Sequence, residues 1–403
     1  MAALGKSADR KVRLLSIVGT RPEAIKIAPI ALAASRYPCL SHHILATGQH
    51  DALFEDALGG FGLAADLRLP PIPRDPSPDV LVNRMVPALT ALLPTLGPDM
   101  VLVQGDTSTA LAGAIAAHRL GVPIGHVEAG LRSHDLSNPW PEERNRVLID
   151  QLSTLLFAPT EAAAANLDRE ADISGQIVIT GNTCIDALFA MRVRLPDLTG
   201  LTIAQAKDVG TKLILLTCHR RENFGAGIAN ICAAALRLAD RGDVRLLCPV
   251  HPNPAVSAIV RECLEGHPAV TLTGTLGYRE MVAAMTAARL ILTDSGGIQE
   301  EAPALGIPTL VLRDVTERPE ALASGNLALV GTEPDRIVEI ASRLLEDPRA
   351  HAAMARPSYP FGRGDAADKI LDVIEQYFSS EPLHVLPLPF ATSWIMDDAP
   401  KGA

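Results

Sequence analysis

The segment 294–301 combines the residue types of an anion site with acceptors for sugar hydroxyls. It follows the apolar run 290–292 and reads Asp-Ser-Gly-Gly-Ile-Gln-Glu-Glu before a helical pattern. A strand that ends in paired glycines and then becomes a helix offers free backbone N–H groups and a positive dipole end, which suit a phosphate. Glu300 and Glu301 are placed to accept hydrogen bonds from ribose hydroxyls. The stretch predicts a nucleoside diphosphate site, with a plain helix start capped by Ser295 as the alternative.

Three basic residues stand where a helix dipole disfavours positive charge. Arg21 and Lys26 lie at and just inside the helix start that Pro22 marks after the first apolar run. Arg318 stands at another predicted helix start in the second half. A bound anion would remove the conflict, and such local conflicts point to function. A solvated basic pair is the alternative for Arg21 and Lys26.

Carboxylates follow two neighbouring apolar runs and open a third element. Asp106 follows the run 100–103, where a helix cap is the alternative role. Glu128 ends the next run, and because a carboxylate at an apolar strand end is expensive to bury, it is the stronger candidate for a cleft group. Glu142 begins a helix with Arg146 one turn on, and a surface salt bridge between them is the alternative.

A histidine and arginine cluster follows the run 213–217. His219 and Arg220 lie at its end, where imidazole and guanidinium groups can hold a phosphate and transfer a proton. His251 follows the next run in the same way, with a structural role in its loop as the alternative.

The elements that must position these residues alternate between short apolar runs and longer helical patterns. This alternation predicts parallel sheets with right-handed crossovers, and two groups of strands predict two doubly wound α/β domains with the ligand at the carboxyl ends of the strands. The ten expected strands are 14–18, 43–46, 100–103, 123–127, 155–158, 213–217, 245–250, 270–272, 290–293 and 309–312.

The predicted boundary lies near Gly181, after the run 177–180. It divides the chain into residues 1–180 and 181–365. A helix over 366–378 is expected to pack back on the first domain, and 379–403 is interpreted as a Pro-rich tail.

Composition and missing motifs exclude several classes. The chain of 403 residues has a net charge of −10, which argues against nucleic acid and anionic membranes as partners. Its six dispersed cysteines fit a reducing compartment, so a cytoplasmic protein is expected. It lacks Gly-x-Gly-x-x-Gly after the first strand, a P-loop, Asp-x-Asp and zinc spacing, which predicts no metal and no redox cofactor. The charge of a diphosphate must then be met by Arg, Lys and helix dipoles.

The motif set resembles the non-hydrolysing UDP-N-acetylglucosamine 2-epimerases of bacteria. The motifs follow that family's order over residues 13–320: Gly-Thr-Arg-Pro-Glu-Ala-Ile-Lys, Thr-Gly-Gln-His, Gly-Asp-Thr, His-Val-Glu-Ala-Gly-Leu-Arg, Trp-Pro-Glu-Glu, Gly-Asn-Thr, His-Arg-Arg-Glu-Asn, Pro-Val-His-Pro-Asn-Pro, Asp-Ser-Gly-Gly-Ile-Gln-Glu-Glu-Ala-Pro and Thr-Glu-Arg-Pro-Glu. The resemblance implies two Rossmann-like domains in the glycosyltransferase-B arrangement, interconversion of UDP-GlcNAc and UDP-ManNAc, and a homodimer.

The resemblance also implies residue roles. The catalytic group corresponds to Asp106, Glu128, Glu142 and His219. Substrate binding corresponds to Arg21, Lys26, Arg146, Ser295, Gly296, Gly297, Glu301 and Arg318. A second, regulatory UDP-GlcNAc site corresponds to Gln49, Arg220 and His251, but Asp51 adds a negative charge beside it. The stretch 278–285 matches a segment that lines the uracil, with Met281 where the family often has Phe.

The expected chemistry is elimination followed by re-addition. Departure of UDP acidifies the C2 hydrogen and gives 2-acetamidoglucal, and inversion then requires proton return on the opposite face, so carboxylates are needed on both sides of the ring. The alternatives are a hydrolysing epimerase that releases ManNAc and UDP, a transferase of the same fold with an external acceptor, and a sensor that has lost catalysis. Retention of all four candidate catalytic residues disfavours the sensor.

Overall fold

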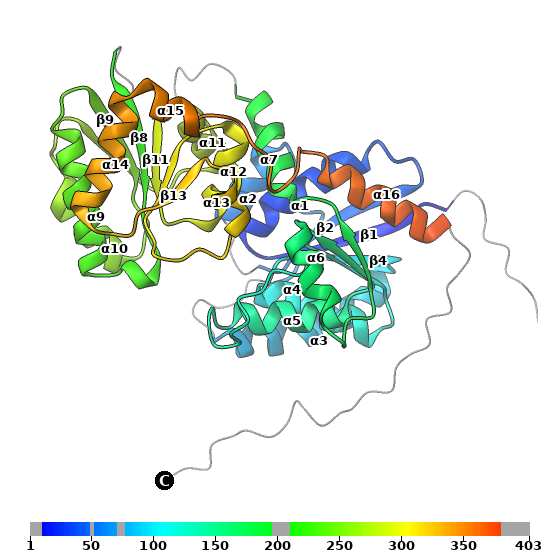
Figure 1. Cartoon of the computed structure of the whole chain (residues 1–403). Helices are drawn as coiled ribbons and strands as arrows, with labels where there is room; N and C mark the ends of the chain where they lie inside the picture. Colours follow the sequence, from blue (N-terminus) through cyan, green and yellow to red (C-terminus); the bar gives the residue numbers. More distant parts are fainter. Residues whose placement is uncertain (1–9, 49–51, 71–76, 196–209, 380–403) are drawn as a thin grey trace, which may run out of the picture.

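The computed structural model describes residues 10–48, 52–70, 77–195 and 210–379 (Figure 1). Gln49 and Asp51 of the expected second site lie outside the described residues, as does the predicted tail after Ser379.

Seven parallel strands form the first sheet, in the order β3-β2-β1-β4-β5-β6-β7. Leu14 of β1 packs into one hydrophobic cluster, whereas Leu15 and Ile17 pack into another, so both faces of the sheet are covered. The strands are β1 (Val12–Val18), β2 (Leu40–Ala46), β3 (Leu67–Arg68), β4 (Met100–Gln104), β5 (Ile124–Val127), β6 (Leu155–Ala158) and β7 (Gln176–Ile179).

The helices of this half follow the strands in regular alternation. They are α1 (Arg21–Ala34), α2 (Ala52–Gly60), α3 (Pro78–Leu96), α4 (Ser108–Arg119), α5 (Glu142–Leu152), α6 (Glu161–Asp168) and α7 (Thr183–Val193). Because strand order reverses between β1 and β4, the loops that open α1 and α4 border the crevice in which such sheets bind ligands.

The second sheet has six parallel strands in the order β10-β9-β8-β11-β12-β13. Its strands are β8 (Lys212–Thr217), β9 (Val244–Pro249), β10 (Val270–Thr273), β11 (Leu290–Thr293), β12 (Thr309–Val311) and β13 (Leu327–Leu329). Its helices are η1 (Arg221–Asn223), α9 (Ala226–Ala239), α10 (Pro254–Leu264), α11 (Tyr278–Ala287), α12 (Gly296–Leu305), α13 (Pro319–Ala323), α14 (Pro334–Glu346) and α15 (Pro348–Met354).

The expectation of ten strands was too low, because the described residues form thirteen. The run 177–180 belongs to β7, which completes the first sheet. The short edge strands β3 and β13 were not predicted, because two or three residues are too few to show a strand pattern.

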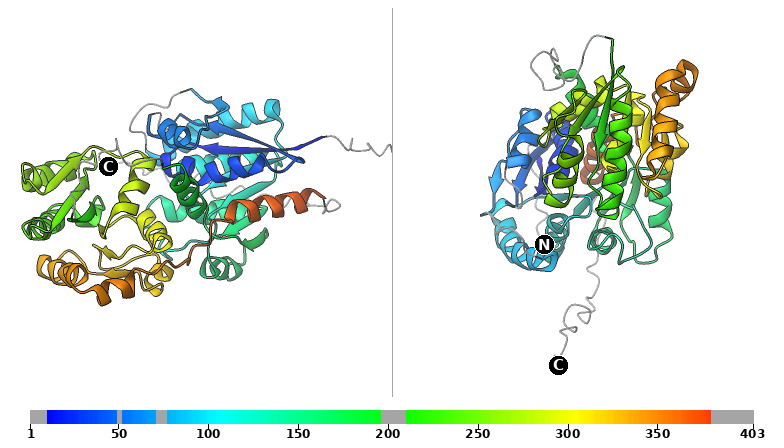
Figure 2. Two further views of the ribbon diagram at one scale, coloured as in Figure 1. Left: turned by 90° about the horizontal axis from the view of Figure 1, so that it is seen from above. Right: turned by 90° about the vertical axis from the view of Figure 1, so that its left-hand side faces the viewer.

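The last helix, α16 (Ala366–Ser379), returns to the first half of the chain and packs on α1 and α7 (Figures 1 and 2). The two connections between the sheets meet where Asn182 N–H donates to Phe361 O at 2.7 Å. A Cβ on Gly181 would lie 3.1 Å from the Cα of Gly362, so only glycine allows this close backbone approach. Because α7 also contacts α11 and α12, the predicted boundary at residue 180 stays a prediction.

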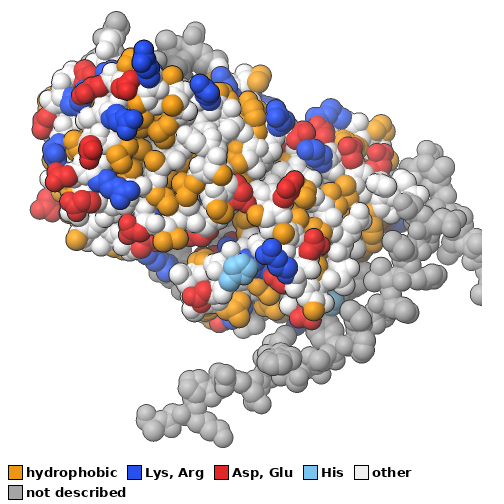
Figure 3. Space-filling view, in the orientation of Figure 1, with side chains coloured by type: hydrophobic (Ala, Val, Ile, Leu, Met, Phe, Trp, Pro, Cys, Tyr) orange, Lys and Arg blue, Asp and Glu red, His pale blue; other side chains and the backbone are white. Residues whose placement is uncertain are grey.

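On the face drawn in Figure 3, acidic and basic side chains are interspersed over both halves. Among the described residues, no helix combines the length and apolar character needed to cross a bilayer.

Candidate active site

Glu128 lies at the centre of a buried polar network at the carboxyl end of β5. Its backbone is left-handed, with φ 72°, which turns the side chain away from the strand direction. The carboxylate is 9% exposed and accepts hydrogen bonds from Lys26 of α1, Gln104 of β4 and Asn182, the last at 2.8 Å. A carboxylate held by three donors is fixed in position and stabilised as an anion.

Glu300 of α12 joins this network from the second sheet. Its Oε1 accepts from Arg318 Nε at 2.6 Å, and its Oε2 lies 3.7 Å from Lys26 Nζ and 3.3 Å from Asn182 Nδ2. Both oxygens of Glu300 are thus engaged by protein donors, and its binding of ribose stays a prediction. Asn182 donates to Glu128 and Glu300 alike, so one amide links the acidic groups of the two sheets.

Charge compensation in this network shifts three pKa values. Burial acts to lower the pKa of Lys26 and Arg318, but the nearby glutamates outweigh it and raise both. Burial acts to raise the pKa of Glu300, but Lys26 and Arg318 lower it. The two cations and Glu300 therefore stay ionised near neutral pH, which leaves the cations available to attract a phosphate.

Asp106 lies in the loop after β4, paired with Arg146 of α5. It does not cap α4, because Thr107 takes that position and its hydroxyl accepts from Ala110 N–H. The alternative of a salt bridge between Glu142 and Arg146 is wrong. Arg146 instead bonds Asp106 and approaches Glu143 Oε2 at 3.1 Å, because its side chain extends back toward the strand ends.

Glu142 opens α5 and is partly exposed. Within the described part of the chain its carboxylate has no hydrogen-bond or ion-pair partner. Its neighbour Glu143 is buried and accepts from the backbone N–H groups of Ser133 and His134 at 2.9 and 3.0 Å. Glu143 thus shapes the loop before α5, while Glu142 keeps its lone pairs available.

Arg21 and Glu23 have opposite roles at the start of α1. Buried Glu23 accepts from the N–H groups of Gly19 and Thr20 at 3.0 and 2.7 Å, and from Thr107 Oγ1 at 2.6 Å, which ties the loops after β1 and β4 together. Arg21 makes no direct hydrogen bond or ion pair with another described residue, and burial lowers its pKa. The negative charges of Asp56 and Glu301 lie near enough to act against that effect, so Arg21 is a partly buried cation beside carboxylates that it does not bond directly.

The predicted phosphate loop has the expected strand-to-helix form, since β11 ends at Thr293 and α12 begins at Gly296. Ser295 is the N-cap residue, but its hydroxyl does not cap the helix. A Cβ on Gly296 would lie 2.8 Å from the Arg318 guanidinium, so the glycine lets that cation reach the helix start. Gly297 is open to its surroundings. Backbone N–H groups and Arg318 thus converge where a phosphate is expected.

Glu301, the predicted ribose acceptor, lies beside this loop. It accepts a 2.8 Å hydrogen bond from the phenol of Tyr278 on α11. Burial raises the pKa of Glu301 to about 7, although the Tyr278 hydrogen bond acts to lower it. Met281 is on the same helix, one turn further on, and is partly buried.

His219 is held at the end of β8 by Asp294, a fully buried carboxylate. Asp294 accepts from the backbone N–H groups of His219 and Arg220 and lies 3.3 Å from His219 Nδ1. The ring of His251 stacks on His219 at 5.3 Å between centroids, so these two histidines form one cluster. Burial lowers the pKa of His219, against Asp294, which acts to raise it. The expected second-site residues Arg220 and His251 therefore adjoin His219.

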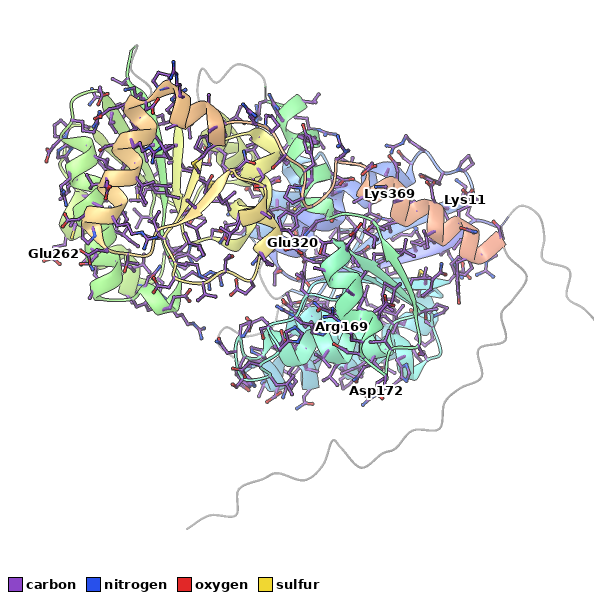
Figure 4. The ribbon with its side chains drawn as sticks, viewed as in Figure 1. Lys11, Arg169, Asp172, Glu262, Glu320 and Lys369 are labelled. Atoms are coloured by element: carbon purple, nitrogen blue, oxygen red, sulfur yellow. The ribbon has the colours of Figure 1, made fainter. Side chains whose placement is uncertain are left out.

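A further contact between the halves lies at the helix starts of α6 and α13. Thr160, the N-cap of α6, donates to Glu320 at 2.9 Å, and Figure 4 labels Glu320 where the two halves face each other. The predicted site residues thus lie in loops and helices at the carboxyl ends of the strands, on the sides where the two halves meet.

Sequence reasoning gave no role to several residues that hold the site in shape: Gln104, Asn182, Glu143 and Asp294. It placed Tyr278 in the stretch that lines the uracil but did not predict its bond to Glu301. It also missed Glu23, although a signal was present. Glu23 stands three residues after the N-cap Thr20, which is the spacing of a capping box.

The fold consists of two parallel sheets, and a cationic helix start and a group of carboxylates lie together at their strand ends. This architecture defines an α/β protein of the glycosyltransferase-B arrangement, in which the candidate site lies where the halves join. The predicted fold class is confirmed. The sequence model described as UDP-N-acetylglucosamine 2-epimerase matches residues 33–375. The chain belongs to this family, as the motifs indicated.

Individual members of this family are similar to the chain over nearly its whole length. The UDP-N-acetylglucosamine 2-epimerases of Yersinia pestis and Escherichia coli K12 are each 42% identical to it, over 91% and 90% of this chain and 99% and 98% of theirs. The structure of the Neisseria meningitidis epimerase bound to UDP-GlcNAc superposes with a TM-score of 0.84 at 40% identity, covering 91% of this chain and all of that one. The Methanocaldococcus jannaschii epimerase in complex with UDP-GlcNAc and UDP gives 0.77 at 32%, with the same coverage.

Proposed function

We propose that the protein interconverts UDP-GlcNAc and UDP-ManNAc by eliminating UDP and adding it back to a bound 2-acetamidoglucal. The observation that carries this proposal is the placement of Asp106, Glu128 and Glu142 on three adjoining segments of the first half, across from the Arg318 and Gly296 helix start of the second. Proton-transfer groups thus face a diphosphate site, which is what elimination of a nucleotide from a sugar requires.

In the proposed binding step, the second half of the chain holds the nucleotide and the first half adds a positive charge. Ser295, Gly296 and Gly297 would receive the diphosphate with Arg318, and Glu301 would accept from the ribose once it leaves Tyr278. Arg21, which has no direct partner among the described residues, supplies a cation that becomes paired only when the phosphates arrive.

The protonation step rests on the differing environments of the three carboxylates. Glu128 has both oxygens bonded to protein donors, so it serves best as fixed negative charge beside a developing oxocarbenium ion. Asp106 is paired with the Arg146 guanidinium, and Glu142 has free lone pairs. We therefore propose that Asp106 and Glu142 remove and return the C2 proton on opposite faces, without assigning which serves which face. His219 would stabilise the departing UDP.

We also propose that the protein is a homodimer and that it works in the cytoplasm. The family resemblance supports a homodimer, and the six free cysteines support a reducing, cytoplasmic environment. Sedimentation at micromolar concentration tests the dimer, since a monomer mass would contradict it.

The product formed from UDP-GlcNAc alone, followed by proton NMR, tests the reaction. We expect UDP-ManNAc and no free sugar. Accumulation of ManNAc and UDP would favour hydrolysis, and turnover only with an added acceptor would favour a transferase. The D106N variant, purified in the same way, serves as the control for contaminating host enzyme.

A further inference from the structure

His126 is a buried histidine of β5 with a hydrogen-bond partner on each ring nitrogen. Its Nδ1 lies 2.5 Å from Asp150 Oδ1, and its Nε2 lies 2.8 Å from the backbone oxygen of Gly105. A carbonyl oxygen can only accept, and an ionised carboxylate can only accept. The ring is therefore held between two acceptors, one on α5 and one in the loop after β4.

Asp150 of α5 is the centre of this buried cluster. It is fully buried, and its Oδ2 accepts from Gly130 N–H at 3.2 Å and lies 2.7 Å from Arg132. Burial acts to raise the pKa of Asp150, but His126 and Arg132 lower it, so the carboxylate is ionised. Glu170 in turn accepts from Arg132 at 2.6 Å, which balances the charge of the group.

The cluster joins the three segments that carry the candidate proton-transfer residues. Gly105 immediately precedes Asp106, and its φ of 67° makes the turn that directs that side chain. Gly130 closes the turn that begins at Glu128. Asp150 lies on α5, the helix that Glu142 opens.

A second set of bonds from α5 supports the same loop. Asn145 donates to the backbone oxygen of Asp106 at 2.9 Å, and Arg146 pairs with its carboxylate. The loop after β4 is thus held by α5 directly and through His126. A shift of that loop would move Asp106 relative to Glu128 and Glu142.

We propose that His126 and Asp150 are positioning residues that set the relative placement of Asp106, Glu128 and Glu142 for the proton transfers. This inference rests on the proposed function, since it assigns the two residues to the same reaction. Neither residue touches the substrate in this account. They act through Gly105, Gly130 and α5.

The test compares two amide substitutions of His126, each of which keeps one of its two hydrogen bonds and removes the other. Asn in place of His126 puts an amide nitrogen near the position of Nδ1 and keeps the bond to Asp150. Gln puts it near Nε2 and keeps the bond to Gly105. We expect H126N to lower kcat about 10²-fold, the scale of a misplaced catalytic group, with an unchanged Kd for UDP. H126Q should recover about tenfold of that loss, because Gly105 is again held.

The control is H351N, which removes a histidine that bonds the backbone oxygen of Arg289 at 3.1 Å in the second half. It should lower the melting temperature but leave kcat unchanged. The inference is overturned if folded H126N has the wild-type kcat, if kcat and UDP binding fall together, or if H126Q is no better than H126N. Wild-type enzyme that fails to epimerise in the same assay would instead overturn the proposed function.

A measurement on the wild-type protein decides the case in which H126N does not fold. Nitrogen-15 NMR of the histidine-labelled enzyme should show a ring N–H that is protected from exchange with solvent, because His126 is fully buried and hydrogen-bonded. Rapid exchange of every ring N–H would overturn the inference, because His126 would then hold neither the loop nor α5.

Discussion

The phenol of Tyr278 donates a 2.8 Å hydrogen bond to Glu301, the carboxylate placed to accept from a ribose. In the proposed function a ribose hydroxyl would be a further donor to this carboxylate. An ionised carboxylate accepts a hydrogen bond more strongly than a protonated one, so the proposed binding favours the ionised form.

We therefore expect UDP affinity to rise with pH. Burial raises the pKa of Glu301 to about 7, so the group is mostly protonated at pH 6 and mostly ionised at pH 8. The change in ionised fraction corresponds to about a tenfold gain in affinity. Calorimetry at both pH values measures it, and E301Q, which keeps only the titration of UDP itself, is the control. An equal pH dependence in E301Q would contradict this role.

Removal of the phenol should shift that profile. The hydrogen bond from Tyr278 acts to lower the pKa of Glu301, so Y278F should move the midpoint of UDP binding to higher pH. At pH 8 the variant should bind UDP more weakly than at pH 9. An unchanged midpoint would show that Tyr278 does not control the protonation of Glu301.

Substitution of Asp106 or Glu142 by the amide should lower kcat by roughly 10²- to 10⁴-fold, the scale of a positioned acid or base, with little change in UDP affinity. Glu301→Ala should instead weaken UDP binding. E161Q, at an exposed glutamate of α6, provides the matched control. Calorimetry and steady-state kinetics together separate the two classes, and identical behaviour of the classes would refute the division of roles.

Turnover in D2O should place deuterium at C2 of both product and recovered substrate, because the proton is removed and returned by side chains that exchange with solvent. Proton NMR and mass spectrometry measure the label. Product without C2 deuterium after complete conversion would contradict proton transfer by exchanging carboxylates.

EDTA should leave the rate unchanged. The sequence has no Asp-x-Asp motif, and the described residues hold no group of three metal-binding side chains. In the proposed function Arg21 and Arg318 are the cations that meet the charge of the diphosphate. A loss of rate that Mg²⁺ restores would show that these cations are insufficient.

The placement of the site residues could be predicted from the sequence because buried parallel strands appear as apolar runs. The carboxyl ends of such strands lie at the same edge of their sheet. Asp106 and Glu128 follow two such runs, just beyond the ends of adjacent strands. The partners could not be predicted. Asn182 reaches Glu128 and Glu300 over 54 and 118 residues, a contact fixed only when the two halves pack together.

The alternative of a salt bridge between Glu142 and Arg146 failed for a related reason. Helical spacing favoured Glu142 as the partner of Arg146. The long side chain of Arg146 instead pairs with Asp106, which lies within its reach in another loop. The backbone of Glu128 was equally hidden, since a left-handed glutamate has no mark in the sequence.

The close approach of Gly181 and Gly362 has a mechanical consequence. The two backbone crossings are joined there by the bond from Asn182 to Phe361, so the two connections cannot slide past each other or separate while that bond lasts. We expect any relative movement of the halves to pivot about this point.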